Sequence, residues 1–344
     1  MTSWIDSKCL YPLTFKPIYQ SRIWGGTRMH DVLGREVPAE LAPVGESWEL
    51  SDRDDAMSTV AAGPLAGRTF REVLNHYGVH LTGSKISPNK PFPLLVKLID
   101  AGERLSLQVH PDEDACVRLG GGAEPKTEMW YIISAAKDAK ILAGLSPRAT
   151  KVQLRDRLNS AEVEHLMQVY QSIEGDAYFI PSGTLHAIGA GNLILEIQQS
   201  SDTTYRVSDW GRLDAEGNSR ELHVEKGMAS INFTNRTTPR ISGVSDAVSH
   251  NRKFSIVRNC RYFAVDDLRL RDIWFDDTAT SASCHLISAV NRPVRIGRAL
   301  NAGGDGTSTE LAPGVTALVP FCYGPYEIQP LEPGGETKVL KTSL

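Results

Sequence analysis

Residues 175–188 read GDAYFIPSGTLHAI and are the most informative stretch of the chain. The pattern predicts a short strand, a tight turn over residues 181–183, and a histidine, His186, aimed back at the same sheet. A side chain that directly follows such a turn is rigidly presented, as a metal ligand must be. A single histidine is more often structural, so the role of His186 depends on its partners.

The rest of the chain has the texture of a β protein. Its 29 glycines and 19 prolines interrupt short apolar runs along the whole length, which is typical of a β-sandwich or barrel. Residues 92–100, FPLLVKLID, are apolar almost throughout, so we place them in a sheet core. The predicted strands cover residues 47–50, 92–100, 105–110, 129–134, 139–144, 176–180 and 193–199.

Two regions have helical patterns. Residues 69–77 begin at a capping residue, Thr69, and end before Gly78. Residues 147–173 carry apolar side chains at helical spacing with a restart at residues 160–162, so we predict two short helices there. This helical insert separates the segment of Glu128 from that of His186, and would cover or buttress the barrel.

A domain boundary is expected where the chain becomes polar, near residues 236–252. We predict a catalytic domain over residues 1–240 and a smaller β domain over residues 250–344. Residues 314–320, GVTALVP, echo residues 175–181 but are followed by no histidine. We therefore expect the second domain to be a barrel of the same type without a metal site.

Composition narrows the function classes. The net charge of −4 provides no field for binding nucleic acid or an anionic membrane, although a local basic pocket is compatible with it. The five cysteines are scattered and unpaired in sequence, which indicates free thiols in a reducing compartment. With no signal-peptide pattern and no apolar run near 18 residues, we expect a soluble, cytoplasmic protein.

Two further segments supply possible metal ligands. Gln108 and His110 are two residues apart, so on a strand they share one face with Ser106. Lys126 and Glu128 have the same spacing. Each pair alone suits an exposed strand face or a surface ion pair. Together with His186, they form a nitrogen and oxygen ligand set for a divalent cation, with Zn²⁺ as first choice and Mn²⁺, Fe²⁺ or Co²⁺ as alternatives.

Other polar residues could bind a ligand. Glu196 lies on the strand that follows the His186 turn. Arg206 follows a Ser-Ser-Asp turn and could bind a phosphate through its planar fork, or pair structurally with Asp202. Trp24, in the segment RIWGG, could edge a sugar site or simply cover the core.

These segments resemble the short form of the type I mannose-6-phosphate isomerase family. The similarity runs in family order over about the first 210 residues, and the remainder is similar only in texture. The matching segments are residues 22–26 (RIWGG), 45–49 (GESWE), 90–97 (KPFPLLVK), 105–112, 126–130 (KTEMW), 181–187 and 201–206.

The resemblance implies a mainly β fold of two cupin, jelly-roll-like barrels, with the helical insert at about residues 147–173 in the first. It also implies one zinc ion per chain, held by four residues: Gln108, His110, Glu128 and His186. All four positions are present, which favours an active enzyme over a decayed homologue. Carried over by motif, Arg206 and Lys126 are catalytic, and Trp24 and Ser106 contact the substrate.

The family reaction interconverts mannose 6-phosphate and fructose 6-phosphate through an enediol. Such proton transfer between C1 and C2 needs a base, an electrophile for the oxyanion and an anchor for the phosphate. Glu196 is one candidate base, and a hydroxide on the metal is the other. Arg206 could anchor the phosphate or stabilise the enediolate.

Two other functions suit the same residues. One is an iron-dependent cupin oxygenase, and the other is a non-catalytic sugar-binding regulator. For the isomerase, the expected partner is a small sugar phosphate, without nucleic acid or membrane. We expect a monomer or a weak homodimer.

Overall fold

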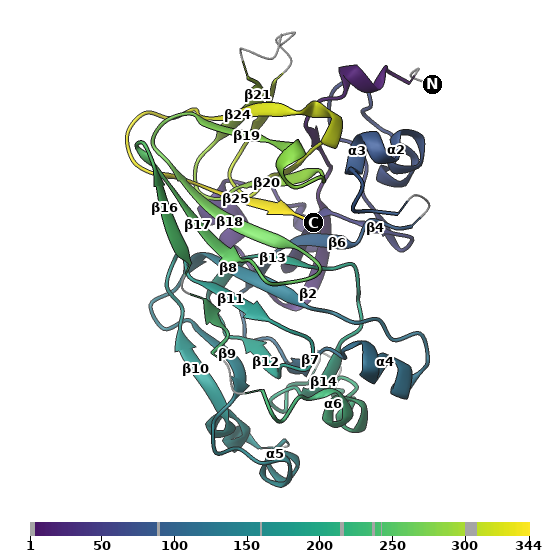
Figure 1. Cartoon of the computed structure of the whole chain (residues 1–344). Helices are drawn as coiled ribbons and strands as arrows, with labels where there is room; N and C mark the ends of the chain where they lie inside the picture. Colours follow the sequence, from purple (N-terminus) through teal and green to yellow (C-terminus); the bar gives the residue numbers. More distant parts are fainter. Residues whose placement is uncertain are drawn as a thin grey trace. The chain divides into compact units, whose positions relative to one another are not determined.

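The computed structural model describes residues 4–87, 90–158, 160–213, 217–235, 238–241, 243–299 and 308–344 (Figure 1). The fold is mainly β, with several antiparallel sheets. Two compact units are each assembled from separated segments. The first comprises Met1–Ile18, Trp48–Val96 and Ser242–Leu344, and the second comprises Tyr19–Ser47 and Lys97–Ile241. The division into domains at residues 240 and 250 stays a prediction about the linear sequence.

Two sheets of described residues carry most of the second unit. The larger has the strand order β15-β11-β8-β13-β6-β2-β3, and the smaller has the order β10-β9-β12-β7-β14. Strands of the larger sheet are β2 Ile18–Gly26, β3 Val44–Leu50, β6 Leu94–Ala101, β8 Glu128–Ala135, β11 Ala177–Ile180, β13 Asn192–Gln199 and β15 Arg240–Ile241. Those of the smaller sheet are β7 Leu107–Val109, β9 Lys140–Leu145, β10 Met167–Gln171, β12 His186–Ile188 and β14 Tyr205–Ser208. Each predicted strand coincides with one of these, within a few residues at its ends.

An apolar core joins the two sheets face to face. It combines Ile99, Ile132 and Ile180 of the larger sheet with Ile141 and Ile188 of the smaller one. All five side chains are 5% exposed or less. Isoleucine is stiff at its β-carbon and suits a pleated, buried surface, and each such side chain contributes roughly 1.5–3 kcal/mol when fully buried. The strands that carry the candidate site residues are therefore held by a continuous core.

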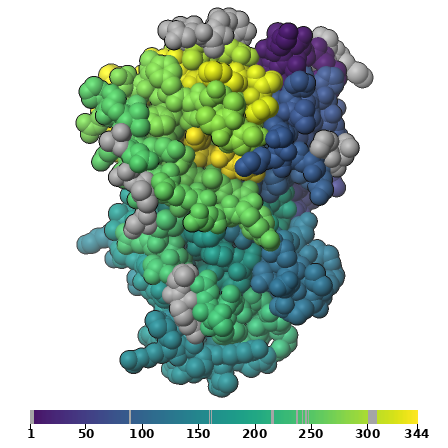
Figure 2. Space-filling view, in the orientation of Figure 1, coloured from purple at the N-terminus to yellow at the C-terminus, as the bar shows by residue number. Residues whose placement is uncertain are grey.

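Helices cover the other face of the smaller sheet. Leu154 and Val163 from the insert pack with Leu107, Leu185 and Ala187 in a second core cluster. The helices of this unit are α1 Arg28–Leu33, α4 Glu113–Leu119, α5 Lys151–Arg157 and α6 Val224–Ser230, with 3₁₀ turns η2 Ala39–Leu41 and η3 Ala161–Leu166. Most of α5 faces solvent and lies at the lower end of the view in Figure 2. The insert thus buttresses the sheet.

The predicted pair of helices in the insert is half right. Helix α5 is confirmed, and Thr150 caps it in a reciprocal arrangement with Gln153. The second predicted helix is present only as the short 3₁₀ helix η3, and the remainder of its predicted range is wrong because the chain then enters β10. Strand β10 satisfies its backbone groups by pairing with β9, where Tyr170 stands opposite Ile141. The apolar spacing there fits either structure, and the free edge of β9 decides for the strand.

Two further sheets build the first unit. The larger has the order β1-β23-β20-β25-β18-β17-β16, and the smaller has the order β19-β24-β21-β22. A core cluster joins them, with Leu268 and Ile287 from one sheet and Ile296 and Tyr326 from the other. The strands are β1 Leu13–Thr14, β16 Val244–Val248, β17 Asn251–Val257, β18 Ala264–Leu270, β19 Trp274–Asp277, β20 His285–Ala289, β21 Val294–Arg298, β22 Ser308–Leu311, β23 Thr316–Val319, β24 Pro325–Pro330 and β25 Thr337–Ser343. The remaining elements are β4 Asp52–Arg53, β5 Ala56–Met57, α2 Phe70–Tyr77, α3 Val79–Thr82, η1 Ser7–Cys9, η4 Thr278–Thr280 and η6 Phe321–Tyr323.

Helix α2 follows its sequence signals closely. Thr69 accepts a hydrogen bond from the backbone N–H of Glu72, whose carboxylate accepts from Thr69 in return. Gly78, just past the helix, has a positive φ of 47°. The predicted start and end of this helix are confirmed.

The two segments that echo each other begin alike. Gly175 and Gly314 have φ of 87° and 80°, in the left-handed region that glycine enters without strain, and lead into β11 and β23. They then diverge. The first continues through a turn to β12 and His186, whereas the second continues into η6.

Two expectations from composition can be compared with the structure. All five cysteines fall in the described residues, and all are free thiols. No helix of the described chain is long and apolar enough to cross a membrane.

Candidate metal centre and substrate cavity

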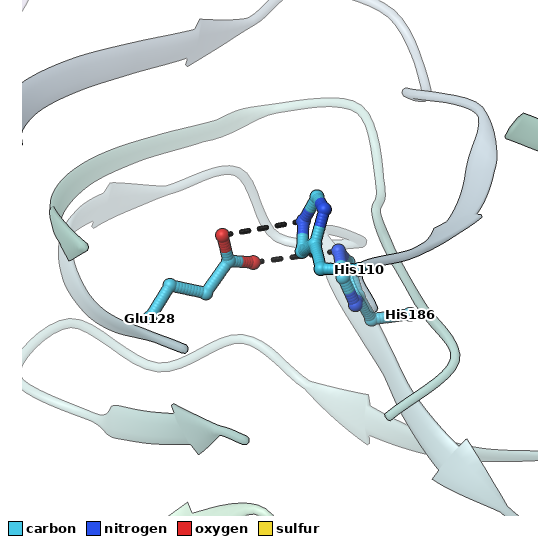
Figure 3. Close-up of side chains that lie close together, drawn as sticks. All are labelled: His110, Glu128 and His186. Carbon is cyan, nitrogen blue, oxygen red and sulfur yellow. Dashed lines mark ion pairs between the residues drawn. The ribbon is translucent and has the colours of Figure 1, made fainter. Parts of the chain in front are cut away.

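His110, Glu128 and His186 converge in the interior of the second unit (Figure 3). His110 directly follows β7, and the other two residues begin β8 and β12. The Nε2 atoms of His110 and His186 lie 3.4 Å and 3.3 Å from Oε2 and Oε1 of Glu128. All three side chains are 1% exposed or less. Residues 76 positions apart in sequence therefore form one compact, buried triad.

Backbone carbonyls fix both imidazoles. Nδ1 of His110 is 2.8 Å from the carbonyl of Thr203, and Nδ1 of His186 is 2.9 Å from the carbonyl of Thr184. A carbonyl only accepts, so each Nδ1 carries the proton and each Nε2 presents a lone pair. Burial lowers the pKa of both histidines, that of His186 to about 3, which keeps the rings neutral.

The triad is rich in acceptors and poor in protons. Burial alone would raise the pKa of Glu128, but Lys126 and the two imidazoles hold it well below its usual value. Nε2 of His110 and Oε1 of Glu128 are buried without a hydrogen-bond partner. Lone pairs that face one another in a dry interior repel unless a cation lies between them. The donor set thus fits a divalent metal ion, and neutral imidazole with carboxylate is a typical set for zinc.

Gln108 supplies the fourth candidate ligand. It stands opposite His186 in the β7–β12 pairing, and its amide Nε2 is 3.2 Å from Nε2 of His186. Rotation of the amide by half a turn would present its oxygen to the same point. The sequence prediction that these four residues gather is matched by their positions, while their role as ligands stays a proposal.

A cavity of about 430 Å³ lies beside the triad. Gln108 and Lys126 line it, and they contact His186 and Glu128 respectively. Its charged lining comprises five cations and three carboxylates, a formal excess of two: Arg22, Lys97, Lys126, Arg206 and Arg220 against Glu46, Glu196 and Asp202. Such a lining suits an anionic, polar ligand.

Glu196 is a carboxylate in this lining with a strongly raised pKa. Burial, opposed by Lys126 and aided by the neighbouring Glu128, raises the pKa of Glu196 to about 7. The indole Nε1 of Trp130 donates a 3.0 Å hydrogen bond to Oε1 of Glu196, and Nζ of Lys97 is 3.9 Å from Oε2. A carboxylate with a pKa near neutrality and a fixed orientation is suited to exchange protons.

Lys126, two residues before β8 begins, and Arg206, on β14, both line the cavity. Nζ of Lys126 is 3.1 Å from Oε2 of Glu128. Burial disfavours its charge, but Glu128 and Glu196 raise its pKa above the usual value, so it remains an ammonium. Arg206 on β14 donates to the carbonyl of Glu221 at 3.0 Å rather than to Asp202.

Comparison with known proteins identifies the family. A sequence profile described as phosphomannose isomerase type I, catalytic domain, matches residues 13–127. The chain is 40% identical over 240 residues to the probable mannose-6-phosphate isomerase GmuF of Bacillus subtilis, covering 69% of this chain and 74% of GmuF. This chain belongs to the type I phosphomannose isomerase family.

Other members extend the similarity. The mannose-6-phosphate isomerase ManA of Bacillus subtilis is 38% identical over 257 residues, 74% of this chain and 78% of ManA. The crystal structure of the mannose 6-phosphate isomerase from Bacillus subtilis superposes with a TM-score of 0.84 at 30% identity, over 97% of this chain and all of that chain. The structural similarity therefore includes the part of the chain beyond residue 210, where the sequence shows only a common texture.

The two predicted substrate-contact residues of this chain also line the cavity. Ser106 precedes β7 and is 4% exposed. Trp24 on β2 is 5% exposed and belongs at the same time to the core between the sheets. Both sequence interpretations of Trp24, as a site edge and as a core residue, describe part of its surroundings.

Sequence reasoning missed four charged residues of the cavity. Lys97 sits in the apolar strand β6 and is 4% exposed, and this buried charge in an apolar run was the available signal. Glu46 lies 3.6 Å from Lys97 and accepts two bonds from Arg22, and both residues stood in family segments without a role. Arg220 had no local signal, because its neighbours in sequence are polar and unpatterned.

Proposed function

We propose that this chain interconverts mannose 6-phosphate and fructose 6-phosphate with one zinc ion held by Gln108, His110, Glu128 and His186. The observation that carries the proposal is the buried triad of two neutral imidazoles and a carboxylate. No proton lies between the Nε2 atoms and the carboxylate oxygens, and the triad adjoins a cavity with excess positive charge. Members of the same family are named for this activity. We further propose that both β regions are cupin-type barrels and that only the first, within residues 1–240, carries the metal.

When bound, zinc would supply a Lewis acid that polarises the sugar oxygens at C1 and C2. The protein supplies the other requirements. The cationic cavity binds the open-chain sugar phosphate, with Arg206 as an anchor for the phosphate. Its planar fork can make paired, charge-assisted bonds to phosphate oxygens.

Glu196 acts as the base in this proposal. Its carboxylate removes the C2 proton of open-chain mannose 6-phosphate while the C1 carbonyl oxygen takes up a proton, which gives the enediol. The carboxylic acid then returns its proton to C1, and the C2 hydroxyl releases to water one proton in place of the one that the C1 oxygen took from water, which gives fructose 6-phosphate. A pKa near 7 lets one group perform both halves at neutral pH. Trp130 holds the carboxylate in place, and Lys126 stabilises negative charge on the enediolate.

A coupled assay for fructose 6-phosphate tests the function. Purified protein treated with a chelator should lose activity and regain it with Zn²⁺. Zinc-loaded protein without turnover would contradict the proposal. Retained sugar-phosphate binding in that case would indicate a regulator, and bound iron with oxygen consumption would indicate an oxygenase.

A further inference from the structure

We infer that Arg220 is a second phosphate-binding arginine and that Asp209 is the positioning residue that holds it at the cavity. The inference rests on the proposed function for the identity of the sugar phosphate. It concerns an anion subsite on the side of the cavity lined by β14. Neither residue belongs to the motif segments that carry the family resemblance.

Asp209 grips Arg220 at two points. Nε of Arg220 donates to Oδ2 of Asp209 at 2.8 Å, and Nη2 donates to Oδ1. Asp209 is itself only 6% exposed. A paired fork of this kind fixes the plane of the guanidinium, so the cation cannot swing freely. Within the described chain, Nη1 has no hydrogen bond, and Arg220 lines the cavity. Its free donors are therefore available to a ligand there.

The fixed turn around Asp209 makes the grip rigid. Asp209 directly follows β14, and the next residue, Trp210, has a positive φ of 59°. The indole Nε1 of Trp210 donates a 2.7 Å hydrogen bond to the carbonyl of Leu105. The carboxylate is thereby anchored to the chain segment that enters β7.

Arg206 and Arg220 form a pair of neighbouring cations. Arg206 donates to the carbonyl of Glu221, the residue next to Arg220. Burial and then the charge of Arg220 lower the pKa of Arg206, which places the two guanidiniums within electrostatic reach. Two guanidiniums held close together and opening on one cavity match a phosphate dianion, and they would repel each other without such a ligand or a carboxylate between them.

Arg212 offers a matched control. It also donates to Oδ1 of Asp209, at 2.5 Å, but it does not line this cavity. Asp209 therefore holds two arginines of which one faces the substrate site. Arg212→Gln removes the same charge and a bond to the same carboxylate as Arg220→Gln does.

Steady-state kinetics and phosphate binding test the inference together. Loss of a charge-assisted bond predicts that Arg220→Gln raises KM for mannose 6-phosphate by about tenfold or more and leaves kcat within about threefold. The same variant should weaken binding of inorganic phosphate, measured as competitive inhibition and by calorimetry, by a similar factor. Asp209→Asn should produce a smaller shift of the same kind, and Arg220→Lys should recover part of the affinity. Arg212→Gln should change neither quantity by more than about threefold.

Equal KM values for Arg220→Gln and Arg212→Gln would overturn the inference, as would unchanged phosphate binding in Arg220→Gln. Calorimetry with inorganic phosphate requires no turnover. If wild-type protein binds phosphate through Arg220 but has no isomerase activity, the proposed function fails while the phosphate subsite stands. If wild-type protein is active and phosphate binding does not depend on Arg220, the phosphate subsite is disproved while the proposed function stands.

Discussion

Two buried histidines, His186 in the second unit and His285 in the first, show what separates a candidate metal ligand from a structural residue. Neither side chain is exposed, and burial lowers their pKa values to about 3 and about 4. His285 has a hydroxyl at each nitrogen, Ser281 Oγ at 2.8 Å and Tyr326 Oη at 2.7 Å. His186 has a carbonyl at Nδ1 and faces a carboxylate with Nε2. A hydroxyl group can either donate or accept a hydrogen bond, whereas an ionised carboxylate can only accept one.

The charges around the two histidines differ in the same way. Near His285, the carboxylate of Asp276 accepts hydrogen bonds from the ammonium of Lys341 at 2.7 Å and from the indole N–H of Trp274 at 3.1 Å. The polar groups around His285 in the first unit therefore supply enough donors for their own acceptors. In the triad, buried acceptors remain without a proton even after Lys126 has paired with Glu128. Burial of a histidine is thus uninformative by itself, and the missing donors mark the site.

The largest expected effect comes from removing the His186 imidazole, which should cost the second unit its metal site. His186→Ala should abolish isomerase activity and lower the zinc content of the purified protein, because a ligand is lost rather than the supporting partner whose removal typically costs 10- to 100-fold. His285→Gln is the control and should leave zinc per folded chain unchanged. Metal analysis beside the coupled assay measures both. Full zinc occupancy in His186→Ala would remove this residue from the ligand set.

The next largest effect separates chemistry from metal binding inside the second unit. Glu196→Gln keeps the size of the side chain and the bond from Trp130 but cannot take a proton. We expect kcat to fall by about 10²- to 10⁴-fold with unchanged zinc content. Glu310→Gln, a change at an exposed ion pair in the first unit, is the control. A kcat within a fewfold of wild type would exclude Glu196 as the base.

In the first unit, loss of the Lys341 ammonium should lower the free energy of unfolding and leave metal binding unchanged. Lys341→Met leaves the buried carboxylate of Asp276 without its cation, which costs about 3–5 kcal/mol when such a pair is broken. Urea unfolding should show this loss, while zinc per folded chain stays constant. The exposed Lys8→Met is the control. Unchanged stability would mean that the cluster does not need its ammonium.

The smallest effect concerns Asp100, a buried carboxylate in β6 that forms no ion pair within the described part of the chain. Its Oδ2 accepts from the backbone N–H of Met29, and burial raises its pKa to about 6. The folded protein therefore binds this proton more tightly than the unfolded chain, so the group's contribution to stability is greatest below about pH 4 and declines until about pH 6.

Asp100→Asn should remove that decline, which is at most about 3 kcal/mol. Urea unfolding of metal-free wild type and variant at pH 4 and pH 7 measures it. The free energy of unfolding of the variant should rise relative to that of wild type as the pH rises. A constant difference between the two proteins would show that Asp100 does not titrate in this range.

The sequence carried much of this picture because some signals are local. The spacing of two in Gln108 and His110 predicts one strand face, and the turn before His186 predicts a fixed side chain. The family motifs then join these segments across the chain. The second helix of the insert failed because residues 166–169 satisfy either period, and only the neighbouring strand β9 decides.

Other parts of the site had no local signal. Arg220 reaches the cavity because Asp209 holds it, and the two residues are eleven positions apart in a stretch without a sequence pattern. The assembly of each compact unit from distant segments is equally invisible to a reading along the chain. The partners of the imidazole Nδ1 atoms are backbone carbonyls, which every residue possesses.

Those carbonyls have a consequence for how the site can change over time. A side-chain acceptor behind a histidine can be lost by a single substitution, whereas the carbonyls of Thr184 and Thr203 persist whatever residue occupies those positions. The tautomers of His110 and His186 are thus protected from most point mutations in their surroundings. Variation at positions 184 and 203 should be tolerated by the triad as long as the backbone keeps its course.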